Sequence, residues 1–203
     1  MATVDAEKKL QKRVLHWLVD DLGYTYLGNL EDIDNTPVKE DLLKANLKKR
    51  GYSDDQIKTA ISELLGKVNN QVDTIYQINR SVYSLLRYGR QGAKDEHGRR
   101  QTVHYINWDD IDSNDFYVAE EVSVLRFDKV TRKRPDVVLY INGIALSVFE
   151  LKSSYVSAGK GIRQMLQNQK RENILNFFST AQFLFAGNEA EGLFYGTTDT
   201  PEK

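Results

Sequence analysis

The 203-residue sequence contains no cysteine and only three histidines. The absence of cysteine excludes disulfide bonds, thiolate ligands for zinc or iron–sulfur clusters, and a cysteine nucleophile. The three histidines, His16, His97 and His104, have no spacing typical of a zinc site. A chain without cysteine suits a reducing compartment, so we expect a cytoplasmic protein whose chemistry depends on carboxylates, amines and amides.

Long hydrophobic runs are also missing. The chain has no stretch of about 18 apolar residues, and its start, MATVDAEKKLQKR, lacks the apolar segment of a signal peptide. We therefore expect a soluble protein with no membrane partner. The segment Gly159-Lys160-Gly161 does not fit the frame of a phosphate-binding P-loop, so this chain alone is not expected to use ATP.

An excess of charge of one sign is likewise absent. The 28 lysines and arginines nearly balance the 29 aspartates and glutamates, and the formal net charge is -1. Any nucleic-acid contact must therefore come from a local basic surface rather than from the whole chain. With 40% hydrophobic residues, the chain has enough apolar material for one well-packed domain.

The first half has the periodicity of helices. Leucines and valines spaced three and four residues apart predict a helix over residues 6–22, with Gly23 just beyond its end. Thr36 followed by Pro37 is typical of a helix start and predicts a second helix over 37–50.

Two further helices are predicted before residue 89. The segment Ser53-Asp-Asp-Gln56 has the capping-box pattern, and Asp73 opens a run of apolar residues at helical spacing that ends at Gly89. The charged, glycine-rich segment 89–101 is expected to be an exposed loop. We interpret the helices of residues 36–88 as an insertion packed on a sheet rather than as a separate domain.

Beyond residue 101 the pattern changes to β-branched and aromatic runs separated by turn residues, which predicts a sheet. The runs lie around Val103 and Tyr105 and over 116–125, 137–141, 144–151, 181–186 and 192–195, with a helix over 157–178. We predict one α/β domain over 1–203, with a core of 6–30 and 100–203. Because the chain stops at Thr200-Pro-Glu-Lys203 without a closing element, we expect a fragment of a longer chain.

Three charged residues stand among core-type residues near the end of the predicted sheet. Asp136 precedes one strand, and Glu150 and Lys152 lie on the returning strand, where a period of two puts both on one face. Two carboxylates suit Mg²⁺, and the lysine can hold an attacking water or offset charge on a phosphate. The competing interpretation is a turn cap at Asp136 and two solvated edge charges. The combination of Pro135-Asp136, a hairpin and Phe149-Glu-Leu-Lys152 is rare, and this favours the interpretation as a metal site.

The geometry of the hairpin between these residues imposes a condition. A strict two-residue turn at Asn142-Gly143 would pair Asp136 with Phe149 and would direct the two carboxylates to opposite faces. A shared metal ion therefore requires a three-residue turn or a bulge in one strand. We predict such a shift of register.

The same residues resemble a known motif. Asp136 with Glu150-Leu-Lys152 resembles the PD-(D/E)xK nuclease motif. Longer strings resemble the N-terminal nuclease region of the R (restriction and translocation) subunit of type I restriction enzymes: NRSVYSLLRYG, KRPDVVLYINGIAL, ELKSS, GIRQMLQNQK and FFSTAQFLFAGNEAEGLFYGT. The resemblance covers the chain from about residue 7 to its end, and it is most specific from Arg134 to Thr197.

This resemblance implies a restriction-endonuclease-like α/β core with a central mixed sheet and Mg²⁺-dependent cleavage of double-stranded DNA. It also implies a longer subunit with a C-terminal ATP-dependent translocase, which assembles with methyltransferase and specificity subunits. ATP and S-adenosylmethionine would then act only through the rest of the enzyme.

The resemblance also assigns individual residues. The aspartate, glutamate and lysine of the motif correspond to Asp136, Glu150 and Lys152. A related group of nucleases has a Gln-x-x-x-Tyr motif on the following helix, where this chain has Gln164 but Asn168 in place of the tyrosine. Such folds often have an acidic residue on the first helix. Glu7 is the available candidate, although a solvated charge in a first helical turn is the stronger interpretation.

Our leading hypothesis is an endonuclease module. Asp136 and Glu150 bind Mg²⁺ with the Leu151 carbonyl, Lys152 positions or activates water, and Gln164 orients the lysine or a phosphate. The residues expected to contact DNA flank this site: Arg132, Lys133, Arg134, Lys160, Arg163 and Lys170. A solvated basic face is the alternative for this cluster. No helix that reads bases is evident, so we expect cleavage without local sequence specificity.

Two other functions remain open at this stage. One is a non-catalytic module in which the nuclease-like sheet only docks the translocase, partner subunits or DNA. The other is a helical nucleic-acid adaptor formed by residues 36–88. The second has less support, because those helices mix lysine with acidic residues as ordinary solvated faces do.

Overall fold

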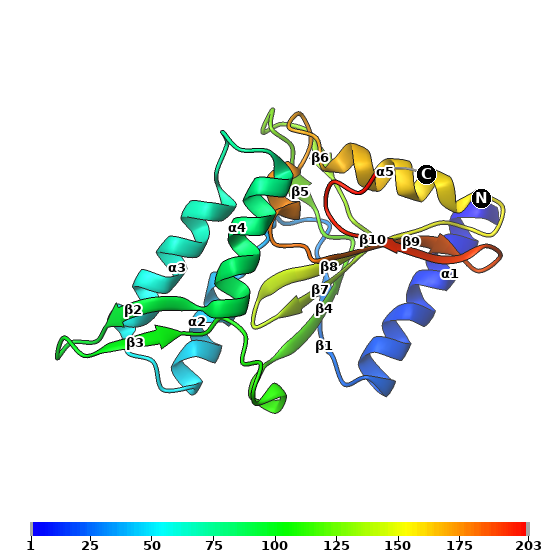
Figure 1. The fold of residues 1–203 in the computed structure, drawn as a ribbon. Coiled ribbons are helices and arrows are strands. Elements are labelled where there is room, and N and C mark those ends of the chain that lie inside the picture. The colour runs from blue at the N-terminus through cyan, green and yellow to red at the C-terminus, as the bar shows by residue number, and fades with distance from the viewer. Residues whose placement is uncertain (1, 202–203) are drawn as a thin grey trace.

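The computed structural model describes residues 2–201, with side chains from Ala6 onward. Its centre is a six-stranded mixed sheet with the strand order β1-β4-β7-β8-β9-β10 (Figure 1). The strands are β1 (Thr25–Asn29), β4 (Phe116–Glu120), β7 (Val137–Ile141), β8 (Ile144–Leu151), β9 (Phe183–Asn188) and β10 (Gly192–Gly196). The pairs β1–β4 and β8–β9 are parallel, and the other neighbours are antiparallel. The predicted fold class, a restriction-endonuclease-like mixed sheet flanked by helices, is confirmed.

Two helices cover opposite faces of this sheet. The first, α1 (Ala2–His16), packs through Leu15 onto Val137 and Phe149. The second, α5 (Ala158–Asn168), is the crossover between the parallel strands β8 and β9, and it covers the other face. Both helices begin at the same end of the sheet (Figure 1). The functional residues described below lie at this end.

The first predicted helix is confirmed, since α1 continues through a π-helical turn (Trp17–Asp21), and Gly23 follows with a φ of 72°. The second begins three residues later than predicted, as α2 (Glu40–Lys49). Pro37 is therefore not at the first helical position. Instead, Val38 forms a β-bridge with Ile144, and Lys39 N–H donates to the carbonyl of Gly143 at 2.7 Å. Because Val38 and Lys39 pair with the start of β8 and the turn before it, the chain stays extended at these residues.

The next two helices are α3 (Asp54–Val68) and α4 (Ile75–Tyr88). The capping box predicted between Ser53 and Gln56 is present, and α4 has a second one that begins at Thr74. The segment predicted to be a loop after α4 is instead a hairpin of β2 (Arg90–Lys94) and β3 (Arg100–Val103). Charged residues mask the strand pattern of this hairpin in the sequence. Its apolar residues Ala93 and Val103 are buried, and both of its strands contact α3.

The predicted strand over 116–125 is divided. Glu121 has a φ of 52° and ends β4, and the two-residue strand β5 (Val124–Leu125) pairs with β6 (Arg132–Lys133) in a separate ribbon. The helix predicted over 157–178 is also divided: α5 ends at Asn168, and a 3-10 helix spans Leu175–Ser179. Another 3-10 helix, Ile111–Ser113, precedes β4.

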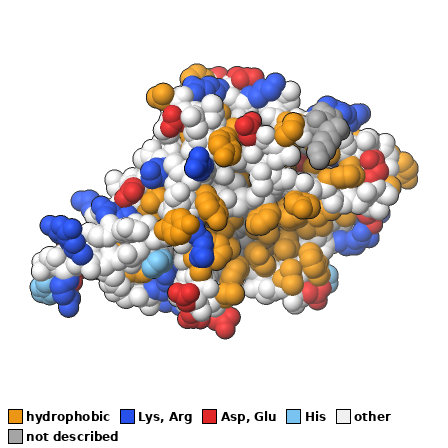
Figure 2. Space-filling model, in the orientation of Figure 1, with side chains coloured by type: hydrophobic (Ala, Val, Ile, Leu, Met, Phe, Trp, Pro, Cys, Tyr) orange, Lys and Arg blue, Asp and Glu red, His pale blue; other side chains and the backbone are white. Residues whose placement is uncertain are grey.

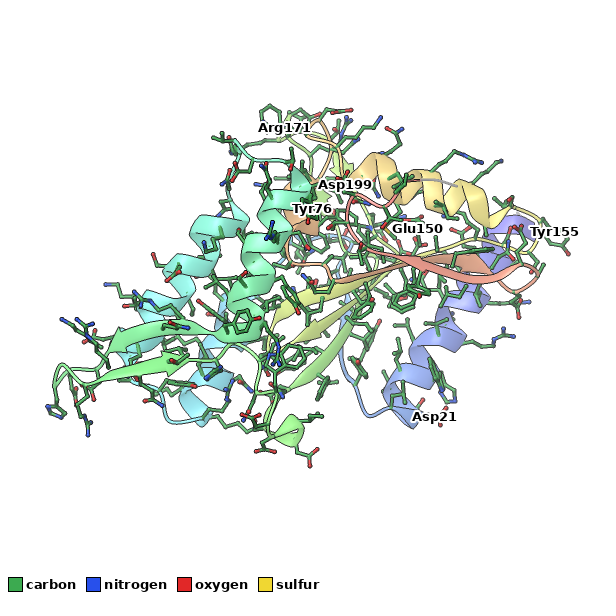
Figure 3. The ribbon with its side chains drawn as sticks, viewed as in Figure 1. Asp21, Tyr76, Glu150, Tyr155, Arg171 and Asp199 are labelled. Atoms are coloured by element: carbon green, nitrogen blue, oxygen red, sulfur yellow. The ribbon has the colours of Figure 1, made fainter. Side chains whose placement is uncertain are left out.

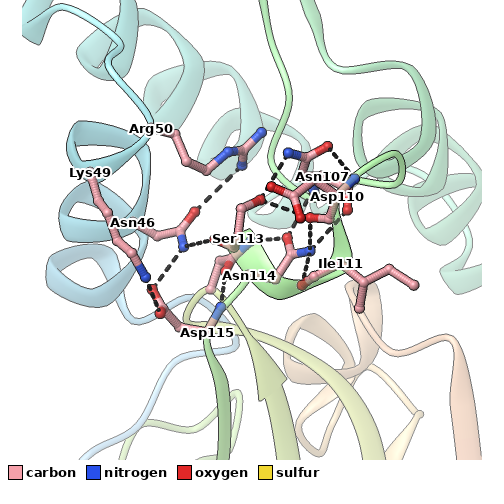
Figure 4. Close-up of polar contacts among 10 residues, drawn as sticks. Asn46, Lys49, Arg50, Asn107, Asp110, Ile111, Ser113, Asn114 and Asp115 are labelled. Atoms are coloured by element: carbon pink, nitrogen blue, oxygen red, sulfur yellow. Dashed lines mark hydrogen bonds and ion pairs between the residues drawn. The ribbon is translucent and has the colours of Figure 1, made fainter.

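The helices α2, α3 and α4 share one hydrophobic core with the sheet. Leu43, Leu64 and Leu86 belong to the same buried cluster as Tyr140 and Val148 of the sheet. Polar contacts join α2 to the segment before β4, where the Asn46 amide donates to Asp115 Oδ2 at 2.7 Å (Figure 4). None of the described helices is both long and apolar enough to cross a membrane.

Candidate active site

The β7–β8 hairpin has the register shift that the sequence predicts. Its turn is Asn142-Gly143, whose φ angles of 53° and 84° suit a two-residue hairpin turn. The pairs are Ile141–Ile144, Tyr140–Ala145, Leu139–Ser147, Val138–Val148 and Val137–Phe149. Leu146 is therefore the extra residue of a bulge in β8. Because the ladder shifts by one residue, Asp136 comes opposite Glu150 on one face rather than opposite Phe149.

Asp136 is fixed through both its side chain and its main chain. Its side chain is buried, and its Oδ2 accepts a hydrogen bond of 2.6 Å from the main-chain N–H of Leu151. Its carbonyl accepts hydrogen bonds from the N–H of Glu121 at 2.9 Å and from the amide of Gln11 at 3.3 Å. These contacts hold the carboxylate beside the strand that bears Glu150.

Glu150 and Lys152 form a buried ion pair. Glu150 is 1% exposed, and its Oε1 lies 2.6 Å from Lys152 Nζ. The other oxygen, Oε2, is buried and has no hydrogen-bond partner among the described residues. Lys152 Nζ also donates to the Leu151 carbonyl at 2.9 Å. The ammonium therefore lies between two oxygens that the sequence analysis assigned to a metal ion.

Burial dominates the electrostatics of the two carboxyl groups. It raises the pKa of Asp136 to about 7, although Lys152 and the Leu151 N–H oppose the shift. Burial, followed by the charge of Asp136, raises the pKa of Glu150 to about 8. Burial lowers the pKa of Lys152, but Glu150 and Asp136 outweigh it, so the net shift is upward. The site therefore favours a positive charge beside its two carboxylates.

Helix α1 adds two residues to the site. Glu7 Oε1 lies 3.6 Å from Lys152 Nζ, which corrects the expectation that Glu7 is a solvated charge. One helical turn further, the buried amide of Gln11 donates to Glu120 Oε2 at 2.9 Å as well as to the Asp136 carbonyl. Sequence reasoning missed Gln11. The available signal was a polar residue one turn after Glu7, within the apolar stripe of the helix.

Helix α5 passes closely over the ion pair, and Figure 3 shows Glu150 between this helix and the β9–β10 ribbon. A Cβ atom added at Gly161 would lie 3.4 Å from the Glu150 carbonyl oxygen and 3.5 Å from Lys152 Cγ. Gln164 is half-buried on this helix, but no hydrogen bond joins it to Lys152 among the described residues. The expected contact is therefore absent. Asn168 is buried, and its Oδ1 has no described partner.

The basic residues expected to contact DNA fall into two groups. Arg132 pairs with Asp34, and Arg134 pairs with Glu31 and, at 2.6 Å, with Glu121. Lys133, on β6, is half-buried. The second group, on α5 or just after it, is exposed and comprises Lys160, Arg163 and Lys170. The two arginines before Asp136 therefore make ion pairs with acidic side chains, and the side chains of the α5 group are largely exposed.

The donor set at this site fits a hard divalent cation. Asp136, Glu150 and the Leu151 carbonyl offer oxygen ligands, and Glu150 Oε2 is a buried acceptor without a described partner. Within the described residues, no group of three or more His, Cys, Asp or Glu side chains is arranged to hold a metal. A bound Mg²⁺ would therefore need water ligands as well, which is its usual coordination in proteins.

The chain also matches a known protein family over nearly its whole length. Residues 6–203 match the family described as the type I restriction enzyme R protein N terminus. The chain belongs to this family. Membership confirms the resemblance stated from the sequence and accords with a nuclease module in an R subunit.

One curated relative of this R-protein domain is a protein of Methanocaldococcus jannaschii. It is described as a "Putative type I restriction enzyme MjaIXP endonuclease subunit", and it is 36% identical over 74 residues. The matched segment is 35% of this chain and 7% of the relative. The chain thus corresponds to a small part of that relative's length.

Proposed function

We propose that the chain is the Mg²⁺-dependent endonuclease module of a type I restriction R subunit. It hydrolyses phosphodiester bonds of double-stranded DNA without local sequence specificity. The observation that supports this most is the bulge at Leu146, which brings Asp136 opposite Glu150 and beside Lys152. A buried cluster of three ionisable groups contributes little to stability by itself, so a functional reason for it is needed.

In this proposal Asp136, Glu150 and the Leu151 carbonyl hold the Mg²⁺. The ion would supply activation of a water molecule and stabilisation of negative charge on the phosphate. Lys152 donates from its ammonium to the attacking water or to a phosphate oxygen. Gln164 orients the phosphate from α5. Water forms the new P–O bond as the opposite ester P–O bond breaks; the attacking water loses its proton to solvent, and the leaving oxygen takes a proton from solvent.

DNA reaches the site along the exposed basic residues Lys160, Arg163 and Lys170, with a smaller direct contribution from Arg132, Lys133 and Arg134. The methyltransferase and specificity subunits, and an ATP-driven translocase in the remainder of the R subunit, deliver DNA in the cytoplasm. Recognition of a target sequence then lies in the partners. Because the partners deliver and recognise the DNA in this proposal, we expect the chain alone to cleave DNA weakly.

The test is Mg²⁺-dependent nicking of plasmid DNA by the assembled enzyme. Wild type is compared with Asp136→Ala and Lys152→Ala, and Lys58→Ala on the distant helix α3 serves as a matched surface control. We expect loss of nicking in the first two variants and wild-type activity in the control. Equal cutting by all four proteins would refute the assignment and would leave a docking module as the better description.

A further inference from the structure

Strand β10 forms an open edge of the sheet. Its five residues pair with β9 without interruption, and no other described residue hydrogen-bonds to its main chain. Its side chains are exposed, with 53% for Leu193, 47% for Phe194 and 78% for Tyr195. An edge of this kind presents unpaired N–H and C=O groups next to apolar side chains, and it readily accepts another strand.

The two edge strands of the sheet differ in how well they are protected against pairing with a strand of another molecule. At the opposite edge, the pairing of β1 with β4 shifts between Tyr26 and Asn29, and such irregularities obstruct the addition of a strand. The β10 edge has no bulge, no proline and no charged residue within Gly192–Gly196. Of the two edges, therefore, only β10 lacks the usual features that prevent edge-to-edge pairing.

The side chains of β10 alternate between the two faces of the sheet. Tyr195 pairs with Phe185 of β9, and their ring centroids are 6.5 Å apart, so Tyr195 lies on the face that α1 partly covers. Leu193 shares that face, and Phe194 lies on the other. Figure 2 shows hydrophobic side chains gathered over the surface of the sheet. On β9, the ring of Phe183, which is 55% exposed, stacks on Phe185 with centroids 6.5 Å apart.

The sequence of this edge matches itself when it is read in the opposite direction. Gly192-Leu193-Phe194-Tyr195-Gly196 has a glycine at each end, an apolar residue on each side and an aromatic centre. In an antiparallel pair centred on Phe194, glycine meets glycine, Leu193 meets Tyr195, and Phe194 meets Phe194. We propose that β10 pairs with β10 of a second copy of this chain, so that two sheets join across a two-fold axis.

This pairing brings apolar side chains of the two copies into contact on both faces of the joined sheet. Leu193 and Tyr195 of the two copies form one apolar cluster on the α1 face, and the two Phe194 rings meet on the other. Directly opposite side chains in antiparallel strands have Cβ atoms about 5 Å apart, which allows these contacts. Two five-residue strands fall short of the ~1,600 Å² that a standard interface buries. We therefore expect a weak, concentration-dependent dimer.

The absence of cysteine from the chain makes a direct test possible. Phe194→Cys places two thiols opposite each other at the two-fold axis, where opposing Cα atoms lie about 4.5–5.5 Å apart, within the range that a disulfide spans. Tyr155→Cys is the control, because Tyr155, which is 78% exposed, is more accessible than Phe194, which is 47% exposed, and lies outside the edge. Under mild oxidation we expect Phe194→Cys to form covalent dimer about tenfold faster than the control.

A second pair of variants tests the register. Leu193→Cys or Tyr195→Cys alone should cross-link slowly, because identical positions off the axis are about 7–8 Å apart. An equimolar mixture of the two should cross-link rapidly, since each then faces the other. Sedimentation of the unmodified chain should show the dimer at high concentration and its loss in Phe194→Lys.

Either of two results would overturn the proposal. One is cross-linking of Phe194→Cys no faster than Tyr155→Cys, which would mean that the edge is free or is covered by a different partner. The other is a mixed pair that links no better than its single variants, which would exclude the two-fold register.

Discussion

The main-chain N–H of Leu151 donates a 2.6 Å hydrogen bond to Oδ2 of Asp136. This bond joins the two strands at the point where the bulged register brings their acidic residues together. It uses one oxygen of the carboxylate, and the described residues make no hydrogen bond to the other. Asp136 therefore has a fixed orientation and one oxygen left for a ligand.

The first prediction concerns Asp136→Asn. The amide oxygen can still accept the Leu151 N–H, but the negative charge is lost. We expect Mn²⁺ affinity, measured by calorimetry, to fall more than about tenfold. The free energy of unfolding in urea should change by less than about 1 kcal/mol, because the hydrogen bond is kept. Unchanged Mn²⁺ affinity would show that Asp136 is not a ligand of the metal ion.

The second prediction compares Lys152→Ala with Glu150→Ala in the absence of metal. Without Lys152, the carboxyl group of Glu150 can take up a proton, since burial raises its pKa to about 8. Without Glu150, the ammonium loses its nearest counter-charge and retains the charge of Asp136, Glu7 at 3.6 Å and the Leu151 carbonyl. We therefore expect Glu150→Ala to melt at the lower temperature. If Lys152→Ala melts lower instead, the lysine is a structural brace and its catalytic assignment is wrong.

Patterns in the sequence correctly predicted those structural features that depend on interactions between neighbouring residues. The capping box at Ser53 and the left-handed Gly23 need only neighbouring residues, and both are present. The start of α2 could not be predicted in this way, because Val38 pairs with Ile144, more than one hundred residues away in the sequence. The hairpin register was predictable for a different reason: two carboxylates that share a ligand must share a face.

The third prediction concerns Gln11, whose amide joins α1 to Glu120 and to the Asp136 carbonyl. Replacement by leucine removes this donor from Glu120 Oε2, and the Asp136 carbonyl then keeps only the hydrogen bond from the Glu121 N–H. We expect Gln11→Leu to lower the free energy of unfolding by about 1–3 kcal/mol. Because α1 also carries Glu7, Mn²⁺ affinity should fall as well. The control is Lys12→Leu, an exposed neighbour on the same helix, which should change neither quantity; equal effects of both variants would contradict a positioning role.

The sequence predicted only the part of the site that lies on one continuous segment, the β7–β8 hairpin and the residues next to it. Asp136, Glu150 and Lys152 lie on one hairpin, so alternation and register were enough to bring them together. Glu7, Gln11 and Gln164 come from two helices whose positions depend on packing across both faces of the sheet. The side-chain spacing within each helix does not specify which residue reaches Lys152, and the expected contact from Gln164 is replaced by Glu7.

The fourth prediction separates basic residues that contact DNA from those that stabilise the fold. Lys160 is exposed on α5, whereas Arg134 pairs with Glu31 and Glu121. We expect Lys160→Ala to reduce the slope of log affinity against log salt by about 1, and Arg134→Ala mainly to lower stability. Fluorescence anisotropy with a labelled duplex in EDTA measures binding apart from cleavage. Lys58→Ala, on α3, is the control, and a slope change equal to that of Lys160→Ala would rule out a local DNA surface.

The fifth prediction is a pH dependence of stability at Asp115, which joins the segment before β4 to α2. Its Oδ2 accepts from Asn46 at 2.7 Å, and its Oδ1 accepts from Lys49 at 3.0 Å (Figure 4). Burial raises the pKa of Asp115, but the hydrogen bonds from Asn46 and Lys49 outweigh it, so the pKa lies below its ordinary value of 3.8. The ionised carboxylate therefore stabilises the folded state above pH 3.8, and this contribution is lost as the pH falls through the lowered pKa.

Asp115→Asn removes this charge and tests the prediction. At pH 6 we expect the variant to be less stable than wild type by up to about 1 kcal/mol, because the pair with Lys49 is partly exposed. The difference should shrink as the pH falls below 3.8, because wild-type Asp115 then also becomes neutral. Urea unfolding at a series of pH values measures it. Asp112→Asn, an exposed neighbour, is the control. A difference that stays constant down to pH values well below 3.8 would show that the loss is steric and that ionisation of Asp115 has no part in it.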